Sequence, residues 1–238
     1  MIDHFKLLQL NSEIEACTRC ARLIRHCQEV AQTRRRAFRE WDYWGKPVPS
    51  FGDPAARLLI IGLAPGTHGS NRTGRMFTGD QSGVFLYRAL YRAGFASQPG
   101  SSHKGDGLEL RDVWITAAGH CAPPDNKPLP GELLNCRPFL ERELALLSNL
   151  RLVLVLGKVA CDAYLRILAD AGRVGRVGQY RFGHNILHGL DPPLLCSYHP
   201  SQQNTSTGKL TEAMFDEVFA RARQIIESGP ARAVPHRL

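Results

Sequence analysis

Residues 57–66 read Arg-Leu-Leu-Ile-Ile-Gly-Leu-Ala-Pro-Gly, an apolar run that ends in a glycine-rich turn. The run Leu58 to Ile61 predicts a buried strand, and the glycines that follow predict a tight turn at its end. A helix is expected after this loop, over Gly83 to Ala93, with Gly94 placed to stop it. Strand, turn and helix in this order form the basic unit of an α/β fold.

The same alternation of strands and helices continues along the chain. Apolar runs predict further strands at 112–118, 152–156 and 193–197, and spaced apolar residues predict further helices at 13–30, 132–148, 158–170 and 211–228. Strands that alternate with helices imply right-handed crossovers and a mainly parallel sheet with helices on both faces.

Length and composition indicate one large globular domain. The chain has 238 residues, of which 43% are hydrophobic and 22% charged, values that exclude wholesale disorder and a collagen-like repeat. We find no internal repeat and expect a single domain over residues 1–228, followed by a frayed tail at 229–238. Net charge is +8, with 24 Arg and 6 Lys, which favours an anionic partner such as nucleic acid, although codon bias would give the same excess of Arg.

Targeting and membrane signals are not found in the sequence. The N-terminal residues 1–17 lack the apolar core of an export signal, and the longest apolar runs are far shorter than the roughly 20 residues of a spanning helix. We therefore expect a cytoplasmic protein without a membrane segment. Seven cysteines in a reducing compartment are not expected to form a disulfide framework.

Four of these cysteines form two spaced pairs. Cys17 and Cys20 are a C-x2-C pair, and Cys121 and Cys136 are a wider C-x14-C pair. Two pairs of thiolates suit either a tetrahedral zinc ion or an iron-sulfur cluster, and spacing alone does not choose between them. Cys27 is an alternative ligand. Cys161 and Cys196 lie among apolar neighbours and are expected to be small core residues.

The segments with unusual composition all follow predicted strands. These are Gly62 to Gly83, Cys121 to Pro130, and His199 to Gly208. Active sites of parallel sheets lie at the carboxyl ends of the strands, so the three segments are expected to meet in one site.

Several of these stretches together resemble the uracil-DNA glycosylase superfamily and, more narrowly, its type B, or family 5, iron-sulfur enzymes. In the order of that family, the chain carries the Cys17/Cys20 pair, Gly62-Leu-Ala-Pro-Gly66, Arg75-Met-Phe-Thr-Gly-Asp80, Cys121-Ala-Pro-Pro-Asp-Asn-Lys127, Cys136, and Tyr198-His-Pro-Ser201 with 204–211. The resemblance implies a three-layer α/β/α sandwich around a four-stranded, mainly parallel sheet. It further implies a 4Fe-4S cluster rather than zinc, and removal of deaminated bases from DNA. The stretches 33–44 and 97–107 carry none of these motifs.

A glycosylase of this kind must flip its base into a pocket and hold it there. Phe77 is the expected stacking ring, with a role as a core aromatic as its alternative. Asn126 offers an amide that both donates to and accepts from the base edge, and otherwise would form an Asx turn. In the first motif, Gly62, Ala64 and Gly66 are expected to line the substrate pocket.

Cleavage of the N-glycosidic bond places positive charge on the sugar and negative charge on the departing base. His199 is expected to donate a hydrogen bond toward the base oxygen. Asp80 is expected to orient the attacking water and to stabilise the oxocarbenium-like sugar, or alternatively to cap the helix that contains Gly83. Many relatives carry an acid or amide in the first motif, where this chain has only Leu63 and Ala64. Because of this departure, activation of the attacking water is expected to depend on Asp80.

Contacts with DNA are expected from the segment after His199. Gln203 and Asn204, with Gln202, are placed to probe a groove, and Lys209 to bind a phosphate. The run Arg34 to Arg36 with Arg39 adds electrostatic attraction, unless it is merely a solvated surface.

The sequence thus predicts a monomeric, monofunctional DNA glycosylase that releases uracil and other deaminated bases, including hypoxanthine, and leaves an abasic site. Two other hypotheses keep the same fold: a uracil-restricted glycosylase of type A repertoire, and a catalytically silent, metal-stabilised DNA-binding protein. A third is a zinc hydrolase, which predicts colourless protein with bound zinc.

Overall fold

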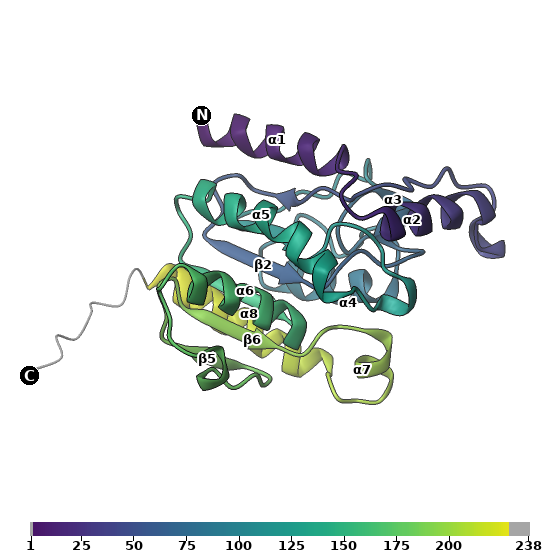
Figure 1. Cartoon of the computed structure of the whole chain (residues 1–238). Coiled ribbons are helices and arrows are strands. Elements are labelled where there is room, and N and C mark those ends of the chain that lie inside the picture. Colours follow the sequence, from purple (N-terminus) through teal and green to yellow (C-terminus); the bar gives the residue numbers. More distant parts are fainter. Residues whose placement is uncertain (1, 229–238) are drawn as a thin grey trace, which may run out of the picture.

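The computed structural model describes residues 2–228, so the tail predicted at 229–238 lies outside the described residues. Its central element is a six-stranded sheet with the order β1-β3-β2-β4-β6-β5 (Figure 1). The four central strands are parallel: β3 (Val113–Ala117), β2 (Leu58–Gly62), β4 (Leu152–Leu156) and β6 (Leu194–Ser197). All residues of these strands are buried, as expected for a sheet covered on both faces.

The predicted fold class is confirmed, but the strand count of four is wrong. Two short antiparallel strands, β1 (Phe51–Gly52) and β5 (Ile186–His188), extend the sheet at its two edges. Strands of two and three residues are too short to show an alternating pattern in a sequence.

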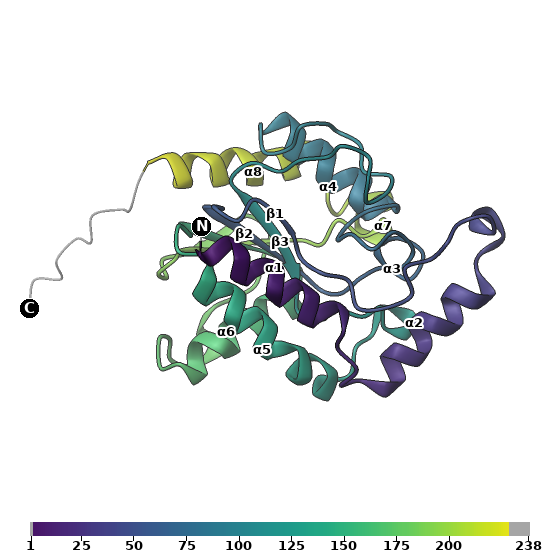
Figure 2. The same cartoon turned by 90° about the horizontal axis from the view of Figure 1, so that it is seen from above.

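Helices cover both faces of the sheet and create three layers (Figure 2). On one face lie α4 (Gln81–Arg92) and α8 (Glu212–Glu227), and on the other α1 (Ile2–Glu15), α5 (Pro130–Leu146) and α6 (Lys158–Asp170). Successive side chains of a strand point to opposite faces. Accordingly, Leu58 and Ile60 of β2 join the core under α4 and α8, whereas Leu59 and Ile61 join the core under α5 and α6.

The N-terminal region differs from the expected single helix over 13–30. It forms two helices, α1 and α2 (Ala21–Thr33), separated by the loop that contains Cys17 and Cys20. Because the apolar spacing continues across the break between the two helices, the sequence pattern does not reveal where the first helix ends. The break leaves both thiols outside regular helix.

The remaining elements are short. They are α3 (Ser70–Thr73), α7 (Gln202–Ser206) and the 3-10 turns η1 (Arg36–Phe38), η2 (Pro124–Asn126) and η3 (Val177–Gln179). The segment after His199, for which no helix was predicted before residue 211, contains the short helix α7. Over residues 2–228, no helix combines the length and the apolar character needed to cross a bilayer.

Candidate active site and cysteine cluster

The end of β2 lies at the centre of the site because Leu63, the residue after this strand, lines two neighbouring cavities. The first has a volume of about 300 Å³ and is lined by His199, Gly157, Tyr198 and Lys209, among others. The second, of about 420 Å³, lies between α5 and α6. The carboxyl ends of the central strands therefore border a broad cleft, as parallel sheets require.

Phe77 lies against both the end of β2 and His199. The Phe77 and His199 rings have centroids 5.8 Å apart and planes inclined by 31°. The Phe77 ring also lies so close to Gly62 that a Cβ built on this glycine would be 2.9 Å from two ring atoms. Phe77 has φ of 52°, a conformation that is costly for a residue with a side chain. The site thus holds the ring in one place with the help of a strained backbone.

The two oxygens of the Asp80 carboxylate have different surroundings. Asp80 caps α4, with Oδ1 accepting a hydrogen bond of 3.0 Å from the backbone N–H of Gly83. Oδ2 lies against the turn after β2, where a Cβ on Gly66 or Gly69 would approach it to 2.6 or 2.0 Å. Burial raises the pKa of Asp80, and the backbone N–H groups of Gly83 and Ser82 and the charge of Arg72 oppose this rise. The capping role weighed from the sequence is present, and Oδ2 takes no part in the capping bond.

His199 follows β6 and is held as a neutral imidazole. Burial lowers its pKa to about 4, so near neutral pH the ring carries no charge and presents one donor and one acceptor. Asn204 fixes the backbone here, because its Nδ2 donates to the His199 carbonyl at 2.8 Å. One N–H of the Asn204 amide is therefore engaged with the protein, and its predicted role as a groove contact stays a prediction.

Asn126 is placed apart from the Phe77–His199 pair. It is exposed in η2, with φ of 56°, and lines the larger cavity together with Leu63 and Ala118. The two cavities meet at Leu63 and Val159, which line both. Phe77, His199 and Gly62 are thus brought together, Asp80 contacts Gly66, and Asn126 faces the adjoining space. Ala64 is half-buried in the turn between them.

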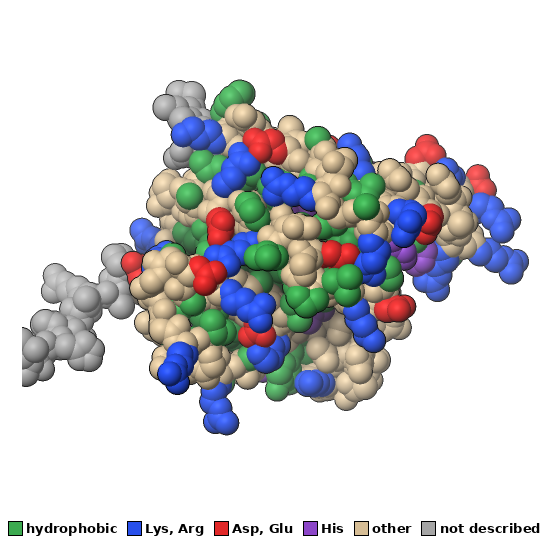
Figure 3. Space-filling view, viewed as in Figure 1, with side chains coloured by type: hydrophobic (Ala, Val, Ile, Leu, Met, Phe, Trp, Pro, Cys, Tyr) green, Lys and Arg blue, Asp and Glu red, His purple; other side chains and the backbone are tan. Residues whose placement is uncertain are grey.

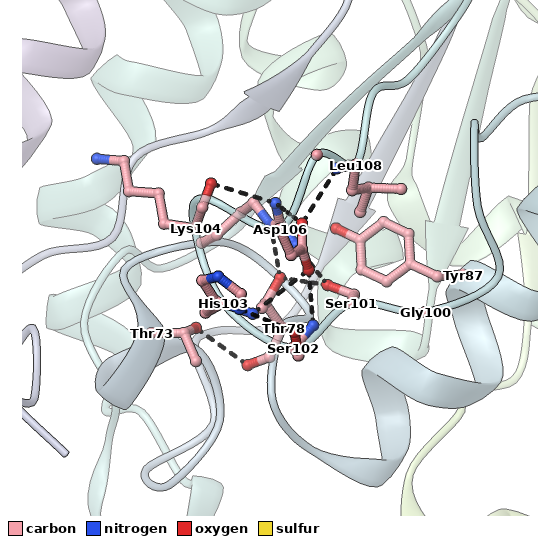
Figure 4. Close-up of polar contacts among 12 residues, drawn as sticks. Thr73, Thr78, Tyr87, Gly100, Ser101, Ser102, His103, Lys104, Asp106 and Leu108 are labelled. Atoms are coloured by element: carbon pink, nitrogen blue, oxygen red, sulfur yellow. Dashed lines mark hydrogen bonds and ion pairs between the residues drawn. The ribbon is translucent and has the colours of Figure 1, made fainter.

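A buried ion pair that sequence reasoning missed holds the segment 75–80 in place (Figure 4). Arg75 and Asp106 have side chains 3% and 6% exposed, with an N–O distance of 2.8 Å. Arg75 also donates to Thr78 and Ser101, whose hydroxyls are 2.7 Å apart, and the Tyr87 hydroxyl donates to Met76 O at 2.8 Å. The loop 97–107, which carries no motif, therefore acts as a clamp on the segment that bears Phe77 and Asp80.

A model of the uracil DNA glycosylase superfamily matches residues 49–223 of the chain. The match covers the whole sheet from β1 to β6 and all the site residues just described. The chain belongs to the uracil-DNA glycosylase superfamily.

Relatives with curated names place it more narrowly in this superfamily. A protein of Thermus thermophilus named Type-5 uracil-DNA glycosylase is 48% identical over 218 residues, which cover 89% of this chain and 94% of the relative. A protein of Mycobacterium tuberculosis with the same name is 46% identical over 222 residues, which cover 92% of this chain and 81% of the relative. One from Pyrobaculum aerophilum is 42% identical over 206 residues, or 87% of each. A Type-4 uracil-DNA glycosylase of that organism is only 29% identical, over 161 residues.

In this member of the superfamily, the four paired cysteines line one cavity. Cys17 and Cys20 come from the loop between α1 and α2, Cys121 follows β3, and Cys136 lies in α5. Among the described residues, no three or more His, Cys, Asp or Glu side chains form a group that could hold a single metal ion. The donor set is four thiols, which are ligands for zinc or iron.

One observation of this cavity fits a bound group. Burial raises the pKa of Cys136 to about 11, so without a positive centre this side chain is a thiol rather than a thiolate. His120 lines the same cavity and is 1% exposed, yet its Nε2 has no hydrogen-bond partner within residues 2–228. The residues present therefore fit a thiolate-ligated metal centre.

The other three cysteines lie outside this cavity. Cys27 is buried behind Cys121, and its thiol contacts the carbonyl of Ala122 at 3.7 Å. Cys161 and Cys196 are fully buried, with their sulfurs 3.8 Å apart in the core between α6 and the sheet.

Residues expected to contact DNA in this superfamily member lie on two surfaces. Gln203 is exposed on α7, and the Lys209 ammonium lies 5.0 Å from the centroid of the Tyr198 ring at the rim of the His199 cavity. The run Arg34 to Arg39 follows α2 in the part of the molecule that protrudes on the right in Figure 3, where several basic side chains gather. Both surfaces carry positive charge suited to phosphates.

Proposed function

We propose that the chain hydrolyses the N-glycosidic bond of uracil in DNA, and that its cleft also admits hypoxanthine and other deaminated bases. As a member of the uracil-DNA glycosylase family, it is a monofunctional DNA repair glycosylase. The observation that carries the proposal is the contact of the Phe77 and His199 rings at the ends of β2 and β6, beside the buried carboxylate of Asp80.

The first step is capture of a flipped base. Phe77 supplies a face for stacking, which replaces part of the stacking lost when a base leaves the duplex. Its ring is already fixed by Gly62 and by the clamp of Arg75, so little conformational entropy is lost on binding. Asn126, at the border of the second cavity, is the proposed reader of the base edge through its amide.

Bond cleavage then separates charge between sugar and base. Neutral His199 donates a hydrogen bond to the base oxygen on which negative charge develops. Asp80, with Oδ2 free of the capping bond, orients a water for attack on the sugar and stabilises the positive charge that builds there. Base and abasic DNA are then released.

Cys17, Cys20, Cys121 and Cys136 are the proposed ligands of a 4Fe-4S cluster. The cluster would supply a cross-link between the N-terminal helices, the segment after β3, and α5. Asn135 donates from Nδ2 to the Cys20 sulfur at 3.4 Å, the kind of contact that orients and tunes a thiolate ligand.

DNA is the partner that the basic surfaces fit. Lys209 is the proposed phosphate contact, and Gln203 and Asn204 are the proposed groove contacts, with Asn204 also donating to the His199 carbonyl.

A wide substrate range is supported by the turn after β2, whose residues 63–66 include no aromatic or charged side chain. The turn after β2 offers only Leu63 and Ala64, and Ala118 lines the adjoining cavity of about 420 Å³. A pocket excludes larger bases by bulk, and these side chains provide little of it.

The test is base release from an oligonucleotide with a single uracil, read as alkali-labile strand cleavage. Wild type should cleave, and Asp80→Asn should be about 10²- to 10⁴-fold slower, the contribution of a general base. Asn is also a good helix cap, so the variant should keep its stability. Binding without release by wild type would instead identify a silent DNA-binding protein. Cleavage of uracil but not of hypoxanthine at high enzyme concentration would restrict the range to uracil.

A further inference from the structure

Arg72, in α3, is a buried cation without an ion-pair partner among the described residues. It is 3% exposed, and within residues 2–228 no carboxylate lies within 4 Å of its guanidinium. Its Nη1 is buried without a hydrogen-bond partner in the same part of the chain. An uncompensated buried charge is costly, so its retention needs an explanation.

The other two guanidinium nitrogens tie together the two backbone segments that frame Asp80. Nε donates to the His68 carbonyl at 2.8 Å, in the turn against which Asp80 Oδ2 is packed. Nη2 donates to the Gly79 carbonyl at 2.7 Å, on the residue directly before Asp80. Arg72 thus bridges both sides of the carboxylate.

Two aromatic rings hold the guanidinium there. Its central carbon lies 3.9 Å from the centroid of Phe38 and 4.1 Å from that of Trp41, and the two rings meet at 81°. Each ring offers its negative face, which stabilises a cation in place of an acid. Both rings come from the stretch 33–44, which carries none of the sequence motifs.

We propose that Arg72 is a positioning residue for base release: its guanidinium keeps Asp80 ionised and fixes the two segments that frame it, and Phe38 and Trp41 hold the guanidinium for this task. This inference rests on the proposed role of Asp80. Burial raises the pKa of Asp80, and the positive charge of Arg72 opposes that rise. Without the cation, Asp80 would become protonated at a higher pH.

The other polar groups around this arrangement do not replace Arg72. The Tyr43 hydroxyl bonds to Nδ1 of His68 at 3.1 Å, and the Gly83 and Ser82 N–H groups face the Asp80 carboxylate. Burial, followed by the charges of Arg35, Arg72 and His26, lowers the pKa of His68. These effects favour the neutral imidazole of His68, and Arg72 is the cation whose charge opposes the raised pKa of Asp80.

The experiment measures the pH profile of single-turnover uracil release for wild type, Arg72→Gln and Arg72→Lys. Arg72→Gln removes the charge, and the acidic limb of its profile should move upward by roughly one pH unit. Arg72→Lys keeps the positive charge but loses the guanidinium that donates to the carbonyls of both His68 and Gly79. The acidic limb of its pH profile should therefore stay near that of wild type, while its maximal rate falls. A purely structural role would lower all rates and leave the limb in place.

Arg88→Gln is the matched control, because Arg88 lies on the helix that Asp80 caps and is 54% exposed. Solvent screens its charge, and its profile should overlay that of wild type. Phe38→Leu is measured alongside. Its acidic limb should move in the same direction as that of Arg72→Gln, but by a smaller amount. This variant keeps the inference testable if Arg72→Gln does not fold.

The outcomes separate this inference from the proposed function. If wild type releases no uracil, the proposed function fails. If wild type is active but the acidic limbs of Arg72→Gln and Phe38→Leu overlay it, the role of Arg72 is refuted while the glycosylase activity stands. A shift as large in Arg72→Lys as in Arg72→Gln would also refute it.

Discussion

Single side chains at this site depend on contacts that a sequence does not display. The Asp80 carboxylate divides its oxygens between a helix cap and the turn at Gly66 and Gly69, so its capping and chemical roles are compatible. The sequence offered them as alternatives because it does not tell which oxygen meets which partner. Arg72 was missed altogether, since an arginine held by aromatic rings looks the same in a sequence as one in solvent.

Gly62 sets the position of the Phe77 ring, and a methyl group there should displace it. We expect Gly62→Ala to slow uracil release by roughly ten- to a hundredfold, because small misplacements of a substrate contact are costly. Overpacking should lower the free energy of unfolding by only about 1 to 3 kcal/mol. Single-turnover kinetics and urea unfolding measure the two effects.

Gly119→Ala provides the comparison for this prediction. A Cβ on Gly119, just beyond β3, would have its nearest neighbour at 3.7 Å, an ordinary contact. Its rate should match wild type. Equal rates for Gly62→Ala and wild type would mean that the place of the Phe77 ring does not matter.

At the scale of elements, prediction succeeded where a long pattern had clear ends. Strand β4 and helix α6 have the predicted bounds, because a run of apolar β-formers ends at Gly157 and a helical pattern begins beside it. The prediction of one continuous helix over 13–30 was wrong, because amphipathic spacing continues across the loop at Cys17 to Cys20. The clamp from loop 97–107 was also missed, since a buried ion pair between distant loops leaves no local pattern.

That clamp should contribute strongly to stability. Removing one partner of a buried ion pair leaves the other charge uncompensated, so Asp106→Ala should lower the free energy of unfolding by about 3 kcal/mol. Burial raises the pKa of Asp106, but bonds from Arg75 and from the Ser102 and Leu108 N–H groups outweigh this and hold it well below its usual range. Because the pKa of Asp106 is lower in the folded than in the unfolded protein, the ionised carboxylate stabilises the fold at pH values above the unfolded-state pKa, near pH 4. This stabilisation is lost as the pH falls further.

Urea unfolding at neutral pH measures this difference, and Asp170→Ala is the control. Asp170 pairs with Arg137 at the surface and is 65% exposed, so its loss should cost less than about 1 kcal/mol. Equal costs for the two variants would contradict a special role for the clamp.

At the scale of the whole molecule, the four paired thiols join parts that are distant in sequence. α1 packs on α5, and the cavity between the cysteines connects the N-terminal helices to the segment after β3. The sequence identified the four residues and their shared chemistry, but their convergence needed the fold. A single domain over 1–228 stays a prediction, for which one cooperative unfolding transition is the expected sign.

Loss of one proposed ligand should remove the cluster and destabilise the molecule together. We expect Cys17→Ala to lose the visible absorbance of an iron-sulfur protein and to unfold at a lower temperature. Cys161→Ala should keep the absorbance, because Cys161 lies in the core beside Cys196. A cluster-free Cys17→Ala protein that is fully stable but inactive would contradict a structural role, and colourless wild type with bound zinc would contradict the iron.

The placement of these thiols along the chain also affects synthesis on the ribosome. All four proposed ligands lie at or before Cys136, whereas β4, β6 and His199 come later. A nascent chain therefore exposes a complete ligand set before the last strands of its sheet exist. For the proposed 4Fe-4S cluster, metal delivery could therefore precede completion of the active site, and a shortage of iron would act on the chain before the proposed catalytic His199 is translated.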